Sequence, residues 1–360
     1  MTTAMVGTVL LASGIGALAG MQVCGVLLDR LNGSYVTLAA GVAMAVSVLV
    51  PLTATTTAGA LGGALVFGVA TGSADVSMNS AAIGVERAYG RPIMASFHAV
   101  FSLGSVAGSL LASVAFVLHL PALPAAGAVA VLVVAVLAGI SRWLVGFSFR
   151  IKDDSRPNRD PSAMPPVRQQ VSRPRVVVLG VLAFLLLLSE GGAMDWSSLH
   201  AQQHFAAQPA LGSLAFGCFV TAMTVGRFCI DGIAARIGPV AVVRWGCALA
   251  AVGIGTVIVA PVISVAFVGW LLFGFGLSGG IPQVFTAAGD VGEGSGQVLA
   301  GVVGMGYVAM MAGPALIGWL AQLSSMNAAL LLPLCATAAC VPAAAAVGPR
   351  SGTKRKDCAA

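Results

Sequence analysis

The stretch LVFGVATGSADVSMNSAAIGVER, from Leu65 to Arg87, decides the class of fold. Its side chains are small or apolar up to Asp75, and the next charged residue after Asp75 is Glu86. A run of this length and composition predicts a helix that crosses a lipid bilayer. Because charged side chains are costly inside a bilayer, Asp75 needs an explanation of its own.

The whole chain shares the apolar character of this stretch. It has 360 residues, of which 58% are apolar and only 8% charged, and its mean hydropathy is +0.97. A soluble domain carries about 25% charged residues, so the composition indicates an integral membrane protein. The runs lack the alternation of barrel strands and predict helices. The eleven candidate spans are 5–27, 35–54, 58–84, 93–118, 123–146, 176–194, 209–230, 239–260, 262–285, 298–320 and 326–346.

The sequence offers no sign of an enzyme, a metal site or a cofactor. Its 7 cysteines are scattered without a C-x-x-C pair, which is typical of small apolar fillers. The extramembrane segments contain no Ser-His-Asp arrangement, no cluster of metal ligands and no phosphate-binding loop of the G-x-x-x-x-G-K-[ST] type. We therefore expect no catalytic residues, no bound metal and no cofactor.

The basic residues predict the topology. All 18 Lys and Arg fall in or beside alternate connections between spans, and the C-terminal tail is basic. By the positive-inside rule these connections and the C-terminus face the cytoplasm, which indicates a multi-pass protein of the cell membrane. The same rule accounts for the basic balance of the chain without a nucleic-acid partner.

The segment from Phe149 to Arg175 is the largest break in the hydrophobic pattern. It is rich in charge and Pro and has no periodicity, as expected of a solvated linker. The predicted organisation is an N-terminal bundle of five spans (1–148), a cytoplasmic linker (149–175), a C-terminal bundle of six spans (176–346) and a basic cytoplasmic tail (347–360).

An internal repeat relates the two bundles. A shift of 206 positions places Arg30 on Arg236 and Gly68 on Gly274. It also aligns Leu65, Phe67, Ala81, Ala82 and Gly90 with Leu271, Phe273, Ala287, Ala288 and Gly296. One register that serves spans and connections indicates duplication. In this register the counterpart of span 176–194 would lie before Met1, so we expect that a first helix is missing.

Two short motifs carry a resemblance to a known family. GVLLDRLNG (Gly25 to Gly33) resembles the G-x-L-x-D-R-x-G loop of the major facilitator superfamily, and GRFCIDGIAARIG (Gly226 to Gly238) resembles its second copy. Asn32 and Ala235 depart from the pattern. The stretches DVSMNSAAIGVERAYGRPIMASFHAVFSLG and SEGGAMDW are similar to the fucose-permease-like branch, specifically its bacterial members of uncertain substrate.

The resemblance implies an all-α polytopic membrane protein with the major facilitator fold. Two helical bundles would bind the substrate between them near the bilayer midplane and give alternating access by rocking. With 11 predicted transmembrane helices, the chain would lack the first of the family's twelve.

Asp75 is the leading candidate for solute contact or ion coupling. At 1.5 Å per residue it lies ~16 Å from Glu86, near the midplane. Thr71, Asp75 and Asn79 form a polar stripe on one helical face. Burial without a cation favours the neutral acid, which could carry a proton or await a cationic solute. Alternatively, Asp75 only bonds a neighbouring helix backbone. Its repeat position is Ile281, so a carboxylate is not required by both halves.

Three further polar residues are candidates for the cavity. Glu190 lies ~22 Å beyond Arg175, and the following Gly191 and Gly192 weaken the helix. His98 lies beside Ser102 and Ser105, and can be a proton relay or a packing group. Gln283 follows Pro282 in a glycine-rich span that predicts a kink. Asp195 is a weaker candidate than Glu190, because it lies at the outer interface.

A second group of residues is better placed for a cytoplasmic gate than for the solute. It consists of Gly25, Asp29, Arg30, Arg227, Asp231 and Arg236. The alternative is that the charges among them only set the topology. The G-x-x-x-G pairs Gly16/Gly20 and Gly104/Gly108 predict close helix packing.

The predicted function is secondary active transport of a small polar solute, coupled to a proton gradient. The partners would be the solute and the bilayer, and the protein would act as a monomer. Two alternatives stay open. A drug/proton antiporter would use the same carboxylate for an organic cation, although Ser109 follows Gly108 where antiporters have a G-P pair. A non-transporting sensor, or a truncated inactive homologue, would bind ligand without flux.

Overall fold

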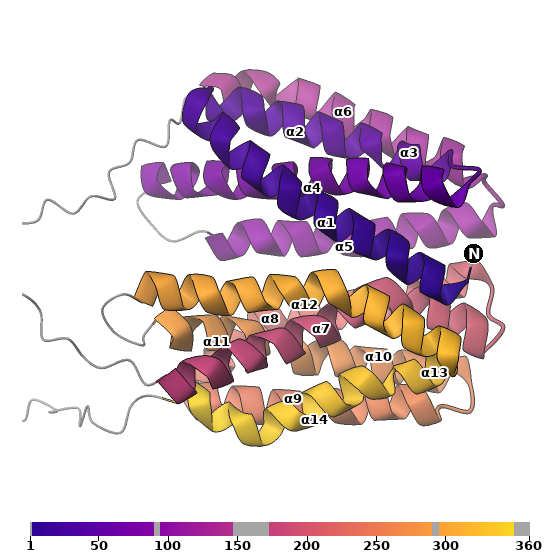
Figure 1. The fold of residues 1–360 in the computed structure, drawn as a ribbon, viewed down its shortest axis with the longest axis vertical. Coiled ribbons are helices and arrows are strands. Elements are labelled where there is room, and N and C mark those ends of the chain that lie inside the picture. Colours follow the sequence, from indigo (N-terminus) through magenta and orange to yellow (C-terminus); the bar gives the residue numbers. More distant parts are fainter. Residues whose placement is uncertain (1, 90–93, 147–172, 290–294, 349–360) are drawn as a thin grey trace, which may run out of the picture. The chain divides into compact units, whose positions relative to one another are not determined.

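The computed structural model describes residues 2–89, 94–146, 173–289 and 295–348, and these residues form helices and their connections without a strand (Figure 1). Eleven of the described helical segments are long and apolar enough to cross a membrane. The prediction of an all-α membrane protein is therefore confirmed. The predicted linker falls mostly outside the described residues, as does the tail after Gly348.

The described chain forms two compact units, which are considered separately. Unit 1 contains the first six helices and Pro314–Leu323, and unit 2 contains the remaining described helices. The helices of unit 1 are α1 (Thr3–Arg30), α2 (Gly33–Ser47), α3 (Leu49–Leu52), α4 (Thr57–Tyr89), α5 (Met94–Val117) and α6 (Ala122–Gly146). Helix α4 packs against both α1 and α2, and α2 also contacts α6.

Unit 2 is built around α7, α8, α9 and α10. Its elements are α7 (Arg173–His204), α8 (Pro209–Ile237), α9 (Pro239–Val259), α10 (Ile263–Leu277), α11 (Gly280–Gly289), α12 (Ser295–Leu323, up to Gly313), α13 (Met326–Ala329), α14 (Leu331–Ala343) and the 3₁₀ turn η1 (Ala344–Val347). Helix α10 packs against α8 and α9, while α7 packs against α8 and α14. Bulky side chains fill this unit, with Trp196, Trp270, Phe219 and Phe273 fully buried.

The helices of unit 2 differ from the hydrophobic runs in two places. Helix α7 continues ten residues beyond the predicted end at 194, because the polar segment after Met194 stays helical up to His204. The span 262–285 is divided into α10 and α11 by Ser278 and Gly279. The kink predicted from its glycines and Pro282 is thus present as a break in the helix.

Helices α1 and α4 approach each other closely enough for backbone contact. A Cβ atom on Gly16 would meet the carbonyl oxygen of Leu65, and one on Gly20 would meet that of Val69. From the other side, a Cβ on Gly68 would meet the carbonyl oxygen of Ser13. The predicted packing role of Gly16 and Gly20 is confirmed.

The second predicted glycine pair behaves differently. A Cβ on Gly104 or Gly108 of α5 would meet no atom within 4 Å in the described part of the chain. These two glycines therefore make no close packing contact there. The spacing G-x-x-x-G identifies a surface that allows close approach, but it does not ensure that a helix occupies it.

Unit 2 repeats the α1–α4 crossing in the predicted register. A Cβ on Gly274 of α10 would meet the carbonyl oxygen of Phe219 of α8, and Gly274 and Phe219 are the repeat positions of Gly68 and Ser13. Gly226, the repeat position of Gly20, also lies close to α10, but a Cβ there would meet the side chains of Ser278 and Phe275 and not a backbone oxygen. The shift of 206 positions therefore aligns a helix contact as well as residue types, which confirms the internal repeat.

The helix that follows α1 in unit 1 and the helix that follows α8 in unit 2 begin in different ways. In unit 1 the side chain of Asn32 accepts a hydrogen bond from the backbone N–H of Ser34 and caps α2. In unit 2 the same repeat position is Gly238, whose φ of 81° lies in the region that favours glycine. Both solutions start the following helix at equivalent positions, Gly33 and Pro239.

Candidate functional site

The polar stripe of unit 1 lies in the middle of α4. The Nδ2 atom of Asn79 donates hydrogen bonds to Oδ1 of Asp75 at 3.1 Å and to its backbone oxygen at 2.9 Å. The hydroxyl of Thr71 donates to the carbonyl of Phe67 at 2.9 Å, so it serves its own helix. The structure thus joins Asp75 and Asn79 into a pair, with Thr71 one turn earlier and bonded locally.

Hydrogen bonds with neighbouring helices fix the orientation of α4. The Ser73 hydroxyl donates to the carbonyl of Gly20 in α1, and the Thr37 hydroxyl of α2 donates to the carbonyl of Ser77. Ser73 and Ser77 lie about 200° around the helix from Asp75, since each residue turns a helix by ~100°. Asp75 therefore points away from the contacts that these two serines make.

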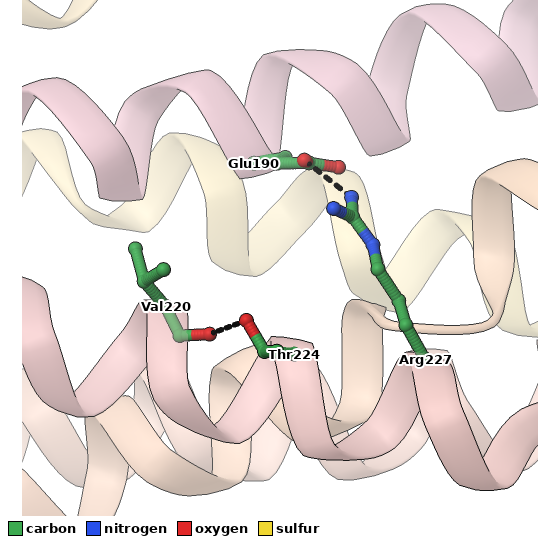
Figure 2. A network of polar contacts seen from close by, with 4 residues as sticks. All are labelled: Glu190, Val220, Thr224 and Arg227. Atoms are coloured by element: carbon green, nitrogen blue, oxygen red, sulfur yellow. Dashed lines mark hydrogen bonds and ion pairs between the residues drawn. The ribbon is translucent and has the colours of Figure 1, made fainter. Parts of the chain in front are cut away.

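Unit 2 contains an ion pair between neighbouring helices. Nη2 of Arg227 in α8 lies 2.8 Å from Oε1 of Glu190 in α7 (Figure 2). The Glu190 side chain is 12% exposed and the Arg227 side chain 35% exposed. Arg227 lies ~15 Å from the end of α8 at Ile237, and Glu190 lies ~21 Å from the end of α7 at His204. Glu190 is therefore well inside its span, whereas Arg227 lies three residues before the end of the candidate span Pro209–Ile230.

The surroundings of this ion pair are tightly packed on the side of α10. Gly226, directly before Arg227, has the side chain of Ser278 where a Cβ would stand. One turn earlier, the Thr224 hydroxyl donates to the carbonyl of Val220 at 2.7 Å (Figure 2). Helix α7 runs through Gly191 and Gly192 without interruption, so the predicted weakening of the helix is not observed.

Sequence reasoning did not anticipate this pair. It placed Arg227 with the cytoplasmic gate and considered Glu190 only as a candidate for the cavity. The available signal was the position of Arg227, which lies before the end of its hydrophobic run, in a helix that continues to Ile237. The identity of the partner, on another helix, has no local signal.

The other predicted site residues are spread over both units. Gln283 lies half-buried on α11, and Asp195 lies exposed on α7. His98 falls within α5 and Asp231 within α8, but their side chains are outside the described part of the structure. Gly25, Asp29 and Arg30 lie at the end of α1, and Arg236 at the end of α8, with all three charged side chains exposed.

A histidine cluster at the far end of α7 was also missed. The ring of His200 is fully buried, and its Nε2 lies 3.1 Å from Oδ1 of Asn327. It stacks on His204 with 5.3 Å between ring centroids and meets the edge of Trp270 at 6.1 Å. The i, i+4 spacing of the two histidines was the signal, but it lies beyond the apolar run from which the span was predicted. Among the described residues no group of three His, Cys, Asp or Glu could hold a metal.

Comparisons with known proteins agree on the family. The Major Facilitator Superfamily profile matches residues 1–290. An uncharacterized MFS-type transporter of Yersinia pestis is 33% identical over 345 residues, covering 94% of this chain and 87% of the relative.

Solved structures agree on the fold. The nucleoside transporter NupG superposes with a TM-score of 0.63 at 14% identity, covering 96% of this chain and 90% of NupG. The transporter FucP in its outward conformation gives a TM-score of 0.58 at 14% identity, covering 95% of this chain and 90% of FucP. The protein is therefore a multi-pass membrane transporter rather than an enzyme, and its chain belongs to the Major Facilitator Superfamily.

Proposed function

We propose that this transporter is a secondary active carrier that moves a small polar solute together with protons by alternating access. It would reside in the cell membrane with its C-terminus in the cytoplasm. The observation that supports this proposal is a carboxylate well inside a span of each unit, Asp75 in α4 and Glu190 in α7. A charged carboxylate costs at least ~2.5 to 3.5 kcal/mol at the bilayer centre, so such residues are kept for a function.

Asp75 is suited to bind and release a proton. Its carboxyl group lies in the middle of α4, and the Asn79 amide one turn later donates to Oδ1. Intramembrane carboxyl groups of this kind commonly belong to proton relays.

Glu190 would be the second proton site. Its carboxylate is paired with Arg227 at 2.8 Å. A change in conformation or solute occupancy that separates the pair would leave the carboxylate free to take up a proton. The proposed cycle therefore protonates Asp75 and Glu190 on the outer side and releases both protons toward the cytoplasm.

The test is proton movement in proteoliposomes that contain the full chain and a trapped pH-sensitive dye. A panel of sugars, polyols, amino acids and carboxylates is applied outside, and inward proton flow with a solute identifies symport. We expect Asp75→Asn to lower solute-driven proton entry at least tenfold, while Asp153→Asn in the linker leaves it unchanged.

Three results would contradict the proposal. Wild-type proton entry in Asp75→Asn would remove the carboxylate from the mechanism. Proton exit on addition of solute would show antiport instead. Ligand binding without any flux would identify a sensor.

A further inference from the structure

We infer that the solute is a small organic anion, and that Arg227 is the residue that binds its carboxylate or phosphate group. This inference rests on the proposed function and specifies its substrate class. It is carried by the Glu190–Arg227 ion pair of unit 2, in which the guanidinium is only partly used and is the more exposed partner.

The guanidinium has unused capacity to bind an anion. An arginine has five N–H donors in a planar fork that matches a carboxylate or phosphate with two parallel hydrogen bonds. Within the described part of the chain, Arg227 makes one such bond, from Nη2 to Glu190 (Figure 2). Glu190 therefore accepts one hydrogen bond from the guanidinium, and the remaining N–H donors are left for another acceptor.

The exposed fractions of the two side chains also favour an anion site at Arg227. Glu190 is 12% exposed, whereas Arg227 is 35% exposed and lies three residues before the end of its span at Ile230. The long side chain of an arginine at such a position can keep its charged end in contact with water or with a polar ligand. Figure 2 shows the long side chain of Arg227 extending from α8 toward Glu190 on α7.

Charge balance favours an anion over a cation. Arginine stays protonated in proteins, whereas carboxylates can be neutralised by protons. Once Asp75 and Glu190 are protonated, Arg227 keeps its positive charge without a counter-ion from Glu190. The proton-loaded state of this pair thus complements a monoanion, and release of the proton from Glu190 restores the ion pair and displaces that anion.

Few other charges could take over this role. The helices packed against α7 and α8 include α10, α11 and α14, which carry no charged residue. On α9 the only charged residue is Arg244, which is exposed near the start of the helix. The remaining Arg, Asp and His residues on α7 and α8 are Arg173, Arg175, Asp195, His200, His204, Asp231 and Arg236, and α8 also carries Cys218 and Cys229. Arg175 donates to the carbonyls of Ala346 and Gly348 near the start of α7, far from the ion pair.

The experiment uses matched solutes and matched variants of the full chain. The probes are D-gluconate against D-sorbitol and D-glucuronate against D-glucose, which differ in the carboxylate. Binding is measured as a thermal shift of the detergent-purified protein, and flux as proton entry into dye-loaded proteoliposomes. We expect at least one anion to raise the melting temperature by several degrees and to drive proton entry, while its neutral counterpart does neither.

Variants assign the anion to Arg227. We expect Arg227→Gln to weaken binding of the anion at least tenfold and Arg244→Gln to leave it unchanged. Glu190→Gln should keep anion binding, because Arg227 retains its charge. If Arg227→Gln does not fold because Glu190 is left unpaired, the double variant with Glu190→Gln removes both charges, and it should fold and fail to bind the anion.

Two sets of results separate this inference from the proposed function. Proton entry driven equally by the neutral and anionic solutes, or anion binding retained without Arg227, would overturn the anion inference and leave proton coupling intact. Anion binding through Arg227 without proton entry would support the inference and overturn proton coupling.

Discussion

The α1–α4 crossing of unit 1 and the α8–α10 crossing of unit 2 have the same packing but different polar residues. In both, a glycine of one helix faces a carbonyl oxygen of the other, at Gly68 and Ser13 or at Gly274 and Phe219. The charged residues are not shared: Asp75 corresponds to Ile281, and Arg227 corresponds to Met21. The duplicated framework is thus built from backbone contacts, whereas these charged side chains occur in one unit only.

The largest expected effect comes from adding a methyl group at the backbone contact that the two crossings share. We expect Gly68→Ala and Gly274→Ala each to lower the free energy of unfolding by about 3 kcal/mol, because the new methyl group meets a backbone oxygen that cannot move alone. Denaturant unfolding of the purified protein measures the loss. Gly104→Ala is the control and should be neutral or slightly stabilising, since nothing lies near it in the described structure. Equal effects of all three changes would show that the contact is not tight.

The next prediction concerns the ion pair of unit 2, which has no equivalent at the repeat position Met21. Arg227→Gln or Glu190→Gln should each cost about 2 kcal/mol, because one charge is left without its partner inside a span. The double variant should cost less than the sum of the two, by about 1 kcal/mol or more. Additive losses would mean that the two side chains do not interact in the folded protein.

Asn327 provides a smaller contrast between the units. It joins three elements of unit 2, since Oδ1 faces Nε2 of His200 and Nδ2 donates to the carbonyl of Ile258 at 2.9 Å. The repeat position in unit 1 is Pro121, which has no such side chain. We expect Asn327→Leu to cost about 1.5 kcal/mol, because a buried imidazole nitrogen loses its partner. Gln203→Leu at an exposed site of α7 is the control, and an equal loss there would exclude a specific role of Asn327.

The smallest predicted effect tests a hydrogen bond of unit 1 that unit 2 cannot form. Ser73 donates to the carbonyl of Gly20 across the helix crossing, and its repeat position is Gly279. Ser73→Ala should lower stability by about 0.6 kcal/mol, the usual size of such bonds in membrane proteins. Ser105→Ala, whose hydroxyl bonds to its own helix, should have no measurable effect. A loss above ~2 kcal/mol for Ser73→Ala would indicate that the hydroxyl is needed for the crossing itself.

Much of the fold could be predicted because it depends on local patterns. Apolar runs located the spans, and the alignment of Gly68 with Gly274 anticipated a framework shared by the two halves. The ends of helices were less predictable, because hydropathy stops where residues become polar. Helix α7 continues past Asp195 to His204, and α8 continues past Arg227 to Ile237.

The candidate site was only partly predictable. The pairing of Asp75 with Asn79 follows from helical spacing and could be expected from the sequence. The pairing of Glu190 with Arg227 depends on how two separate helices are rotated and offset, which no short-range pattern encodes. The hydrogen bond between His200 and Asn327 joins residues even further apart in the chain, so it too required the structure.

The interruption between α10 and α11 at Ser278 and Gly279 has a mechanical consequence. In unit 1 the equivalent positions, Gly72 and Ser73, lie within the unbroken helix α4. An unbroken helix is stiff. Two helices joined by a pair of small residues can change the angle between them through a few backbone dihedrals. Bending between α10 and α11 is therefore expected at Ser278, beside Gly226 and next to Arg227, while the equivalent part of α4 resists bending.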